Sequence, residues 1–335
     1  MSQRFGASAL TLAIMAAFFG PAQATENQAV RALLGAPGQE MTTPQLPGWY
    51  GQVWGQSYTA TSFRDSAGND QSASVGNGVT AVRGGKISAV ALVPRVTYVS
   101  ETMLGDGRLG ISATLPIVNL DVNTTLTGVF PAGFPAAMAT AVQAGLNAKA
   151  ATSSGTVTGL ADMEIAPFID FQDDESRLVL LAAVVAPTGD YKASRAVNTG
   201  AGKFWTFRPG FLYGRAWENG WEFGTRVTYS FNTENSDTQV RSGQYLHADA
   251  SVMYRLNDLW RVGLNGYVLK QTTKDKGPNV AADGNKAQIL AVGPSVGYTS
   301  ESGVWAADLK VLPEFKVRNR PEGTVGWVRL MMRLD

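Results

Sequence analysis

The sequence predicts an all-β protein, a transmembrane antiparallel up-and-down β-barrel of about twelve strands. Apolar and polar side chains alternate over long segments, tight connections alternate with long ones, and aromatic residues gather near the ends of the apolar faces. Successive side chains of a strand point to opposite faces, so each segment has one apolar and one polar face. Transmembrane barrels combine such strands with short periplasmic turns, longer extracellular loops and aromatic girdles.

Three segments carry the alternation most clearly. In residues 221–232 the apolar parity contains Trp221, Phe223, Val227, Tyr229 and Phe231. Residues 258–271 repeat the pattern, and in residues 304–318 Trp305, Leu309, Val311, Phe315 and Val317 face away from Asp308, Lys310, Glu314, Lys316 and Arg318. A soluble β-sandwich shows the same alternation, but its strands usually have only ~5–6 residues. The length of these segments therefore favours the membrane barrel.

The predicted strands cover residues 48–63, 86–100, 108–126, 157–171, 177–187, 203–216, 221–232, 244–255, 259–273, 287–299, 304–317 and 324–335. Tight turns at 104–107, 173–176, 218–220, 256–258 and 301–303 alternate with the long connections 64–85, 127–156, 188–202, 233–243 and 274–286. An even number of strands places both ends of the barrel on the periplasmic side.

The N-terminus predicts export. Arg4 precedes an apolar run over residues 7–19, Pro21 ends it, and Ala22-Gln23-Ala24 forms a small-x-small cleavage site. This arrangement is typical of a secretory signal peptide. We therefore expect a signal peptide over 1–24 cleaved after Ala24, a periplasmic segment over 25–47 and the barrel over 48–335. The expected location is the cell outer membrane, with its lipid and the barrel-assembly machinery as partners.

Composition narrows the chemistry. The chain has no cysteine, which rules out disulfides and thiolate metal sites, and removal of Arg4 from 28 basic and 27 acidic residues leaves 27 of each. A basic nucleic-acid footprint is therefore absent. The G-x-G-x-x-G match at 105–110 precedes a strand rather than a helix, so it indicates a hairpin turn and not a dinucleotide site. We expect no cofactor, no metal and no catalytic residue.

The polar parity supplies candidate lumen residues. A charge at the lipid midplane costs ~2–4 kcal/mol, so these groups must face inward or meet water. The lumen or selectivity candidates are Asp162, Glu164, Arg208, Glu222, Arg226, His247, Asp249, Arg255, Arg261, Asp308, Lys310, Glu314 and Arg329, with Arg333 on the same parity. A wall of both signs can be a salt-bridged structural plug or a selective polar path, and the sequence does not separate the two.

The long connection over 127–156 predicts a helix. Residues 136–151 are rich in alanine, and Met138, Val142 and Leu146 recur at helical spacing after Phe130 and Phe134. We hypothesise a helical lid over or inside the mouth that offers these five side chains to a ligand. The alternative is an external or lipid-facing loop.

His247 is the single histidine, with Asp249 on the same strand face. A hydrolase would have to use it, with Ser251 or Ser242 as nucleophile. The simpler interpretation is a lumen-facing histidine bonded to a carboxylate.

Several motifs resemble those of the bacterial family named for the meta pathway of phenol degradation. They are Pro187-Thr-Gly-Asp-Tyr191, Asn198, Trp205-Thr-Phe207, Pro209, Asn232-Thr-Glu-Asn235, Asp237-Thr238, Arg241-Ser-Gly243, His247, Asp249, Val262-Gly263, Gly266-Tyr267, Gln271, Gly293-Pro294, Gly297-Tyr298, Asn319-Arg-Pro-Glu-Gly323 and Trp327. The resemblance covers the chain from Gly48 to its end and implies a transporter-like outer-membrane barrel for aromatic or other apolar compounds.

Most of the matching residues fall at the expected extracellular rims of strands. There they serve as turn formers and ion pairs, or they form a mouth where ligand first binds; the mouth candidates are Asp190, Tyr191, Glu234, Asp237, Arg241 and Arg320. We predict an outer-membrane channel for passive uptake of small apolar or aromatic compounds. A membrane-embedded hydrolase that uses His247 and a structural barrel that displays loops are the alternatives.

Overall fold

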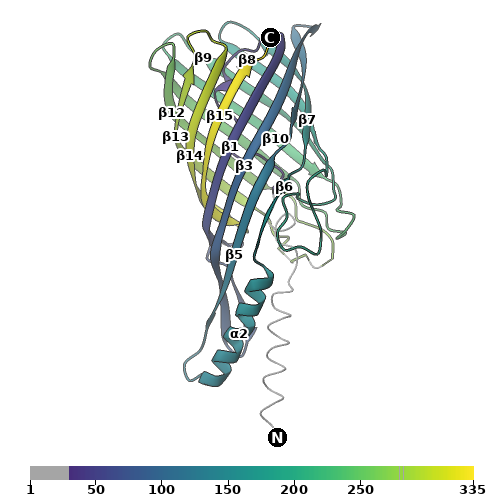
Figure 1. Cartoon of the computed structure of the whole chain (residues 1–335), viewed down its shortest axis with the longest axis vertical. Helices are drawn as coiled ribbons and strands as arrows, with labels where there is room; N and C mark the ends of the chain where they lie inside the picture. Colours follow the sequence, from purple (N-terminus) through teal and green to yellow (C-terminus); the bar gives the residue numbers. More distant parts are fainter. Residues whose placement is uncertain (1–29, 279, 282) are drawn as a thin grey trace.

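A computed structural model describes residues 30–278, 280–281 and 283–335. The predicted signal peptide over 1–24 and its cleavage site lie outside these residues. The described residues form a closed antiparallel barrel with twelve strand positions around its circumference, which confirms the predicted fold class (Figure 1). We call each such position a stave, because two of them consist of two successive strands. The sheet closes because β1 (Gly48–Phe63) pairs with both β3 (Val79–Leu104) and β15 (Pro321–Arg333).

Most predicted strands agree with the structure within a few residues. The staves between β3 and β15 follow in sequence order around the barrel. They consist of β4 (Gly107–Thr114), β5 (Ile117–Val129), β6 (Gly155–Leu160), β7 (Glu164–Gln172), β8 (Ser176–Val185), β9 (Thr206–Ala216), β10 (Trp221–Asn232), β11 (Tyr245–Arg255), β12 (Trp260–Gln271), β13 (Gln288–Thr299) and β14 (Trp305–Arg318). Together β4 and β5 form one stave, and β6 and β7 form another.

Two predicted strands are each broken in the structure. The segment expected over 108–126 consists of β4 and β5, and the one over 157–171 consists of β6 and β7. Both β4 and β5 pair with the long β3, and they are separated by Leu115 and Pro116. Proline has no backbone N–H to donate, which interrupts a ladder. The sequence pattern missed the break because the alternation of side chains continues across it.

β3 extends beyond the barrel to form an arm with β2 (Ser72–Gly76) and β5. The connection predicted over 64–85 is therefore partly a hairpin. The helix α2 (Ala136–Thr152) matches the predicted helix over 136–151 and packs along this arm, away from the barrel wall (Figure 1). No helix in the described ranges has both the length and the hydropathy needed to cross a membrane.

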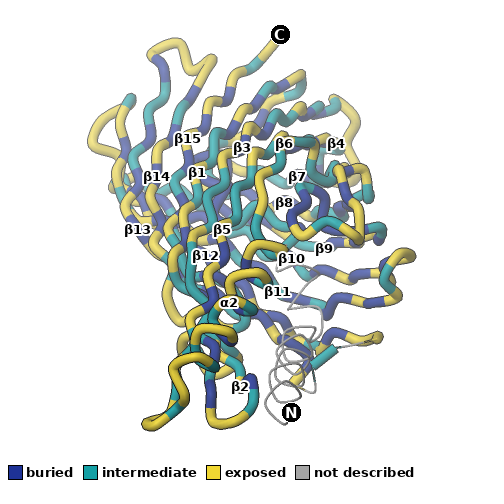
Figure 2. Tube along the Cα trace, turned by 60° about the horizontal axis from the view of Figure 1, so that its bottom comes forward, coloured by how far each residue is buried: buried dark blue, intermediate teal, exposed yellow. Residues whose placement is uncertain are grey.

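The outer surface of the barrel carries the predicted apolar belt with aromatic borders. Exposed side chains of the outward parity include Leu264 (55% exposed) and Val328 (56% exposed). Aromatic rings pair between neighbouring strands at the turn end, with centroids 4.8 Å apart for Trp49 and Tyr98 and for Trp260 and Tyr298. Buried and exposed residues alternate along the staves (Figure 2). The arrangement fits lipid outside the wall and a packed interior within it.

One inward–outward assignment in β14 was wrong. Val317 was placed on the lipid face, but it is only 1% exposed and packs inside. The pairing with β13 shifts between Gln288 and Leu290, and Lys316 adopts a positive φ of 51°. This bulge adds a residue to β14, and an added residue reverses the parity of the side chains that follow it.

The segment over residues 30–47 lies inside the barrel. We expected it in the periplasm, but inner-wall side chains from β8, β9, β11, β14 and β15 bond to it. It includes the short 3-10 helix η2 (Gln39–Met41), whose three residues are buried. Sequence position alone could not reveal this, because the wall residues that hold the segment lie more than a hundred positions away. We call residues 30–47 the lumen segment.

Candidate functional site

The lumen differs in character between its two ends. Toward the long connections, which we assign to the extracellular side, the inner wall is apolar and aromatic. Its buried cluster consists of Ala36, Trp54, Ala91, Val93, Tyr245, Tyr267, Leu269, Ala287, Ile289, Ala291, Leu312, Val317, Val325 and Trp327. Ala36 belongs to the lumen segment and Ala287 directly precedes β13. The other residues come from β1, β3, β11, β12, β13, β14 and β15, so the apolar lining covers much of the circumference.

The apolar part of the lumen segment fills this region. Val30, Ala32, Leu33 and Leu34 pack against the cluster just described. The indole N–H of Trp327 donates to the carbonyl oxygen of Leu34 at 3.0 Å. The chain thus places its own apolar side chains where an apolar ligand would otherwise contact the wall.

Further toward the short turns, ion pairs hold the lumen segment. The Arg329 guanidinium bonds to the carboxylates of both Glu40 and Asp308. The Lys310 ammonium donates to the carbonyl oxygens of Ala36, at 2.9 Å, and Pro37, at 2.5 Å. Glu40 is 7% and Arg329 1% exposed, so the pair has been removed from water. Buried charges persist only when they are paired and hydrogen-bonded in this way.

Arg177 on β8 makes a second anchor. Its guanidinium bonds to Asp170 on β7, with Nη2 2.7 Å from Oδ2. The same side chain donates to the carbonyl oxygens of Glu40 at 2.7 Å and Thr43 at 3.0 Å. One arginine therefore ties two neighbouring staves to the lumen segment.

Arginines also hold the extracellular end of the segment. Arg31 pairs with Asp162, with Nε 2.9 Å from Oδ2. Arg208 on β9 bonds to Glu164 at 2.5 Å, to Tyr245 at 3.1 Å and to the carbonyl oxygen of Arg31. Acidic residues near the junction of β6 and β7 thus fix both the segment and the wall beside it.

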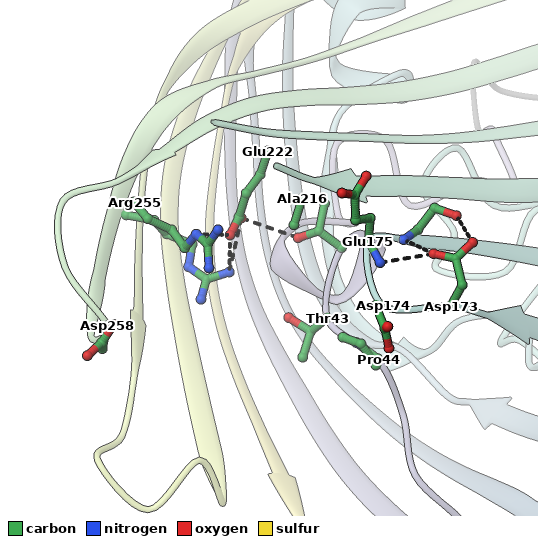
Figure 3. Close-up of a pocket in the computed structure, with 12 residues that line it drawn as sticks. Thr43, Pro44, Asp173, Asp174, Glu175, Ala216, Glu222, Arg255 and Asp258 are labelled. Atoms are coloured by element: carbon green, nitrogen blue, oxygen red, sulfur yellow. Dashed lines mark hydrogen bonds and ion pairs between the residues drawn. The ribbon is translucent and has the colours of Figure 1, made fainter. Parts of the chain in front are cut away.

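A cavity of about 320 Å³ opens at the turn end of the lumen. Glu222 lines it and lies close to two arginines, 3.4 Å from Arg255 Nε and 3.1 Å from Arg261 Nη1 (Figure 3). Its rim includes Asp173, Asp174, Glu175 and Asp258. Within the described residues no group of three or more acidic or histidine side chains is arranged to hold a metal ion. We call this cavity, which charged, hydroxyl and some apolar side chains line, the vestibule.

His247 serves the lumen segment. Its Nε2 lies 3.2 Å from Asp249 Oδ1, and that oxygen accepts the backbone N–H of Gly35 at 2.9 Å. Ser251 is four residues along the same strand, about 13 Å away at the rise of an extended chain. The described hydrogen bonds do not join His247 to any serine side chain. A Ser–His pair is therefore not assembled here.

Comparison with known proteins places the chain in a family. The profile of the family described as "Putative MetA-pathway of phenol degradation" matches residues 64–330. The chain belongs to this family. A search of curated proteins found no match.

The fold of this family member also occurs in solved structures of other proteins. A crystal structure of an outer membrane channel from Pseudomonas putida F1 superposes with a TM-score of 0.67 at 13% identity, covering 89% of this chain and 99% of that one. The toluene transporter TbuX of Ralstonia pickettii reaches a TM-score of only 0.42 at 9% identity, covering 87% and 90%. The first likeness shows a shared fold, and the second is too distant to support an argument.

The structure places the predicted lumen residues of this family member on the inner wall. Twelve of them lie within the barrel: Asp162, Glu164, Arg208, Glu222, Arg226, His247, Asp249, Arg261, Asp308, Lys310, Glu314 and Arg329. Eleven of these pair with one another or with the lumen segment, and Glu314 instead accepts hydrogen bonds from Tyr58, Tyr267 and Gly323. Arg255 lines the vestibule with its side chain 40% exposed, and Arg333 Nη2 donates to Pro47 O at 2.9 Å.

The predicted mouth residues do not form one site. Asp190 pairs with Arg195 on its own loop, and this hydrogen bond holds the pKa of the Asp190 carboxyl below its usual range. The Tyr191 hydroxyl accepts from Asn235 at 3.3 Å. Glu234, Asp237 and Arg241 are exposed. Arg320 differs from the others, because two of its nitrogens are shielded from solvent.

The helical lid hypothesis needs correction. Val142 and Leu146 are 2% and 0% exposed because they pack against Val79, Ala81 and Leu126 on the arm, with Phe130, Phe134 and Met138 beside them. These side chains pack into the hydrophobic core of the arm. Val142 and Leu146 therefore offer no surface to a ligand, whereas Phe130, Phe134 and Met138 stay partly exposed on the arm, away from the barrel lumen.

Several residues of the site escaped the sequence argument. Arg31 and Glu40 were assigned with their segment to the periplasm, while Asp170, Arg177, Arg95 and Trp54 were not singled out. Asp170 shares the even parity of Asp162 and Glu164, so alternation alone would have placed it on the inner wall.

Proposed function

We propose that this protein is an outer-membrane channel for passive uptake of small apolar or aromatic compounds. The observation that carries the proposal is the apolar, aromatic lining of the extracellular half of the lumen, occupied by Val30, Ala32, Leu33 and Leu34. A lumen built to conduct hydrated solutes would be lined with polar groups there. The matching fold of the Pseudomonas putida F1 outer membrane channel supports the same function class.

The bonds between the lumen segment and the wall are of a kind that allows the segment to be displaced. In the described part of the chain its backbone makes only local backbone–backbone bonds, such as Ala36 N to Leu33 O and Met41 N to Gly38 O. Its links to the wall run through side chains, including Trp327, Lys310 and Arg177. No β ladder has to be broken. Each hydrogen bond contributes only about 0.5–3 kcal/mol, and breaking a buried ion pair such as that of Arg329 with Glu40 costs about 3–5 kcal/mol. The segment is therefore an occupant that can leave without unfolding the barrel.

The difference between the two ends of the lumen suits entry of a solute at the aromatic end and exit at the charged end. An apolar solute first meets the aromatic lining and exchanges with the side chains of the lumen segment. It leaves through the vestibule around Glu222, where charged side chains leave an apolar molecule fewer favourable contacts than the aromatic lining does, so that it dissociates. Movement down a concentration gradient needs no energy source and no cofactor.

Uptake by cells that lack the protein tests this proposal. We expect deletion to slow entry of a labelled small aromatic compound while entry of a labelled sugar of similar mass is unchanged, and complementation to restore the aromatic rate. Equal loss of both solutes would indicate a general pore. Unchanged entry of both would contradict transport by this barrel.

A further inference from the structure

The side chain of Arg320 points into the apolar half of the lumen. Arg320 lies in the turn between β14 and β15, after Asn319 with its positive φ of 52°. The ionisable groups that act on its guanidinium are Tyr58, Glu314, Tyr267 and Tyr245. These four come from β1, β14, β12 and β11, and all face inward. The guanidinium therefore lies near three inward-facing tyrosines and Glu314, at the end of the lumen that we assign to the extracellular side.

Two of the three nitrogens of the Arg320 side chain have no acceptor. Nε and Nη1 of Arg320 are shielded from solvent and unbonded, and no residue of the described chain accepts a hydrogen bond from its side chain. Burial lowers the pKa of the Arg320 guanidinium, because its neighbours do not offset the loss of hydration. A sealed donor without a partner costs about 1–3 kcal/mol, and more when it is charged.

Glu314, the carboxylate that acts on Arg320, already accepts three hydrogen bonds. Glu314 Oε1 accepts the Tyr267 hydroxyl at 2.7 Å, and Oε2 accepts the Tyr58 hydroxyl at 3.0 Å and the Gly323 N–H at 2.8 Å. Glu314 is thereby held apart from Arg320, and the two are not within the 4.0 Å that defines an ion pair. The hydroxyls of Tyr58 and Tyr267 are likewise committed, so both residues present their rings to the lumen.

Other buried arginines of the lumen show the contrast. Arg31 pairs with Asp162, Arg177 with Asp170, Arg208 with Glu164, Arg261 with Glu222, and Arg329 with Glu40 and Asp308. The wall thus supplies carboxylates where an arginine is structural. Near Arg320 it supplies three tyrosines and Glu314, a carboxylate that bonds to the tyrosine hydroxyls instead of pairing with the arginine.

We propose that Arg320 binds the carboxylate of a small aromatic acid, with Tyr58, Tyr245 and Tyr267 around the ring of that ligand. A guanidinium matches a carboxylate with two parallel N–H donors, and such charge-assisted bonds are about twice as strong as neutral ones. Aromatic rings pack against one another at offset or edge-on angles with further gain. The inference rests on the proposed function and names the substrate class within it.

Ligand binding and movement of the lumen segment would then be linked. Val30, Ala32, Leu33 and Leu34 pack against the cluster that contains Tyr245 and Tyr267, with Tyr58 beside it. None of these aliphatic side chains can accept a hydrogen bond, so the occupied state leaves Arg320 unsatisfied. An aromatic acid that replaces them satisfies the guanidinium and keeps the apolar packing, which favours the displaced state.

A second guanidinium without a carboxylate lies deeper along the same path. Arg95 on β3 donates from Nη2 to Ser112 Oγ at 2.8 Å, and its guanidinium lies 5.7 Å from the ring of Trp54. Trp54 and Tyr58 face inward on β1 four residues apart, about 13 Å along an extended strand. An anionic aromatic ligand that leaves Arg320 thus meets another cation beside another ring.

Equilibrium binding of two labelled ligands to the purified full barrel tests the proposal. Benzoate and benzyl alcohol share an aromatic ring, and only benzoate carries the charge. We expect Arg320→Gln to raise the Kd of benzoate about tenfold or more, as loss of a charge-assisted bond requires, and to leave benzyl alcohol nearly unaffected. Arg320→Lys keeps the charge without the planar fork and should fall between. Arg195→Gln is the matched control, because Arg195 already has its carboxylate in Asp190.

The outcomes distinguish the role of Arg320 from the proposed function of the barrel as a channel. Benzoate binding that Arg320→Gln leaves unchanged, or an equal loss of both ligands in a folded variant, would overturn the role of Arg320. Benzyl alcohol binding without benzoate binding to the wild-type barrel would overturn the aromatic acid and leave the channel for neutral compounds standing. Absence of binding by both ligands would count against the proposed function itself.

Discussion

The indole N–H of Trp327 donates to the carbonyl oxygen of Leu34 across 3.0 Å, and this bond joins the last stave of the barrel to the lumen segment. Trp327 is 1% exposed. A buried carbonyl that loses its donor is left unsatisfied. The pair therefore holds the apolar end of the lumen segment in place.

Trp327→Phe removes the donor and keeps an aromatic ring. We expect the lumen segment to loosen by about 1–3 kcal/mol, so that hydrogen exchange at residues 30–38 quickens while the strands stay protected. Exchange measured by mass spectrometry reports both regions. Trp305→Phe on the lipid face is the control, and equal exchange in the two variants would show that the Trp327 bond does not hold the segment.

Gly214 leaves room for the lumen segment at the turn end. A Cβ at Gly214 would lie 1.9 Å from the Met41 carbonyl oxygen, whereas one at Gly326 meets nothing nearer than 3.9 Å. Gly214→Ala should push Met41 from its buried place and raise single-channel conductance, while Gly326→Ala should not. Conductance in planar bilayers measures this, and the same value for both variants would contradict the fit.

Glu40→Gln weakens the ionic anchor at Arg329. Breaking a buried pair costs about 3–5 kcal/mol when the remaining charge is left alone, and less here because Asp308 still bonds to Arg329. We expect easier proteolysis of the lumen segment and a barrel that stays folded. Asp190→Asn, in an exposed pair worth about 0–1 kcal/mol, should leave proteolysis at wild-type rates. No difference between the two would mean that Glu40 is dispensable.

Leu146→Ser places a hydroxyl in the core of the arm. Leu146 is 0% exposed between α2 and the arm strands, and truncation of a buried leucine costs about 2–5 kcal/mol. We expect faster protease cleavage within residues 130–152 and unchanged uptake of aromatic compounds. A fall in uptake with the arm still intact would return α2 to the role of a lid.

Features that depend on residues close together in the sequence could be predicted, and features that depend on residues far apart in the sequence could not. Alternation along a strand is local, so the inner-wall placement of residues such as Asp308 and Lys310 was predictable. The helix was predictable from alanine content and the spacing of Met138, Val142 and Leu146. The bulge at Lys316 was not, because β14 alone does not reveal the register with β13.

The occupied lumen could not be predicted for a similar reason. Arg177 reaches the carbonyl oxygen of Glu40 across 137 sequence positions, and Lys310 reaches that of Ala36 across 274. Backbone carbonyls carry no side-chain signature, so nothing in residues 30–47 marks them as partners of the wall. The unpaired state of Arg320 is also visible only once the bonds of Glu314 are known.

A disulfide between the lumen segment and the wall tests whether solutes pass through the lumen when this segment moves. The chain has no cysteine, and a Cβ at Gly224 would lie 2.7 Å from Met41 Cβ, so Met41→Cys with Gly224→Cys can bridge after a small shift. In proteoliposomes the account predicts little uptake of a labelled aromatic compound by the oxidised variant and restored uptake after reduction. Equal uptake in the oxidised and reduced forms would contradict passage through the lumen.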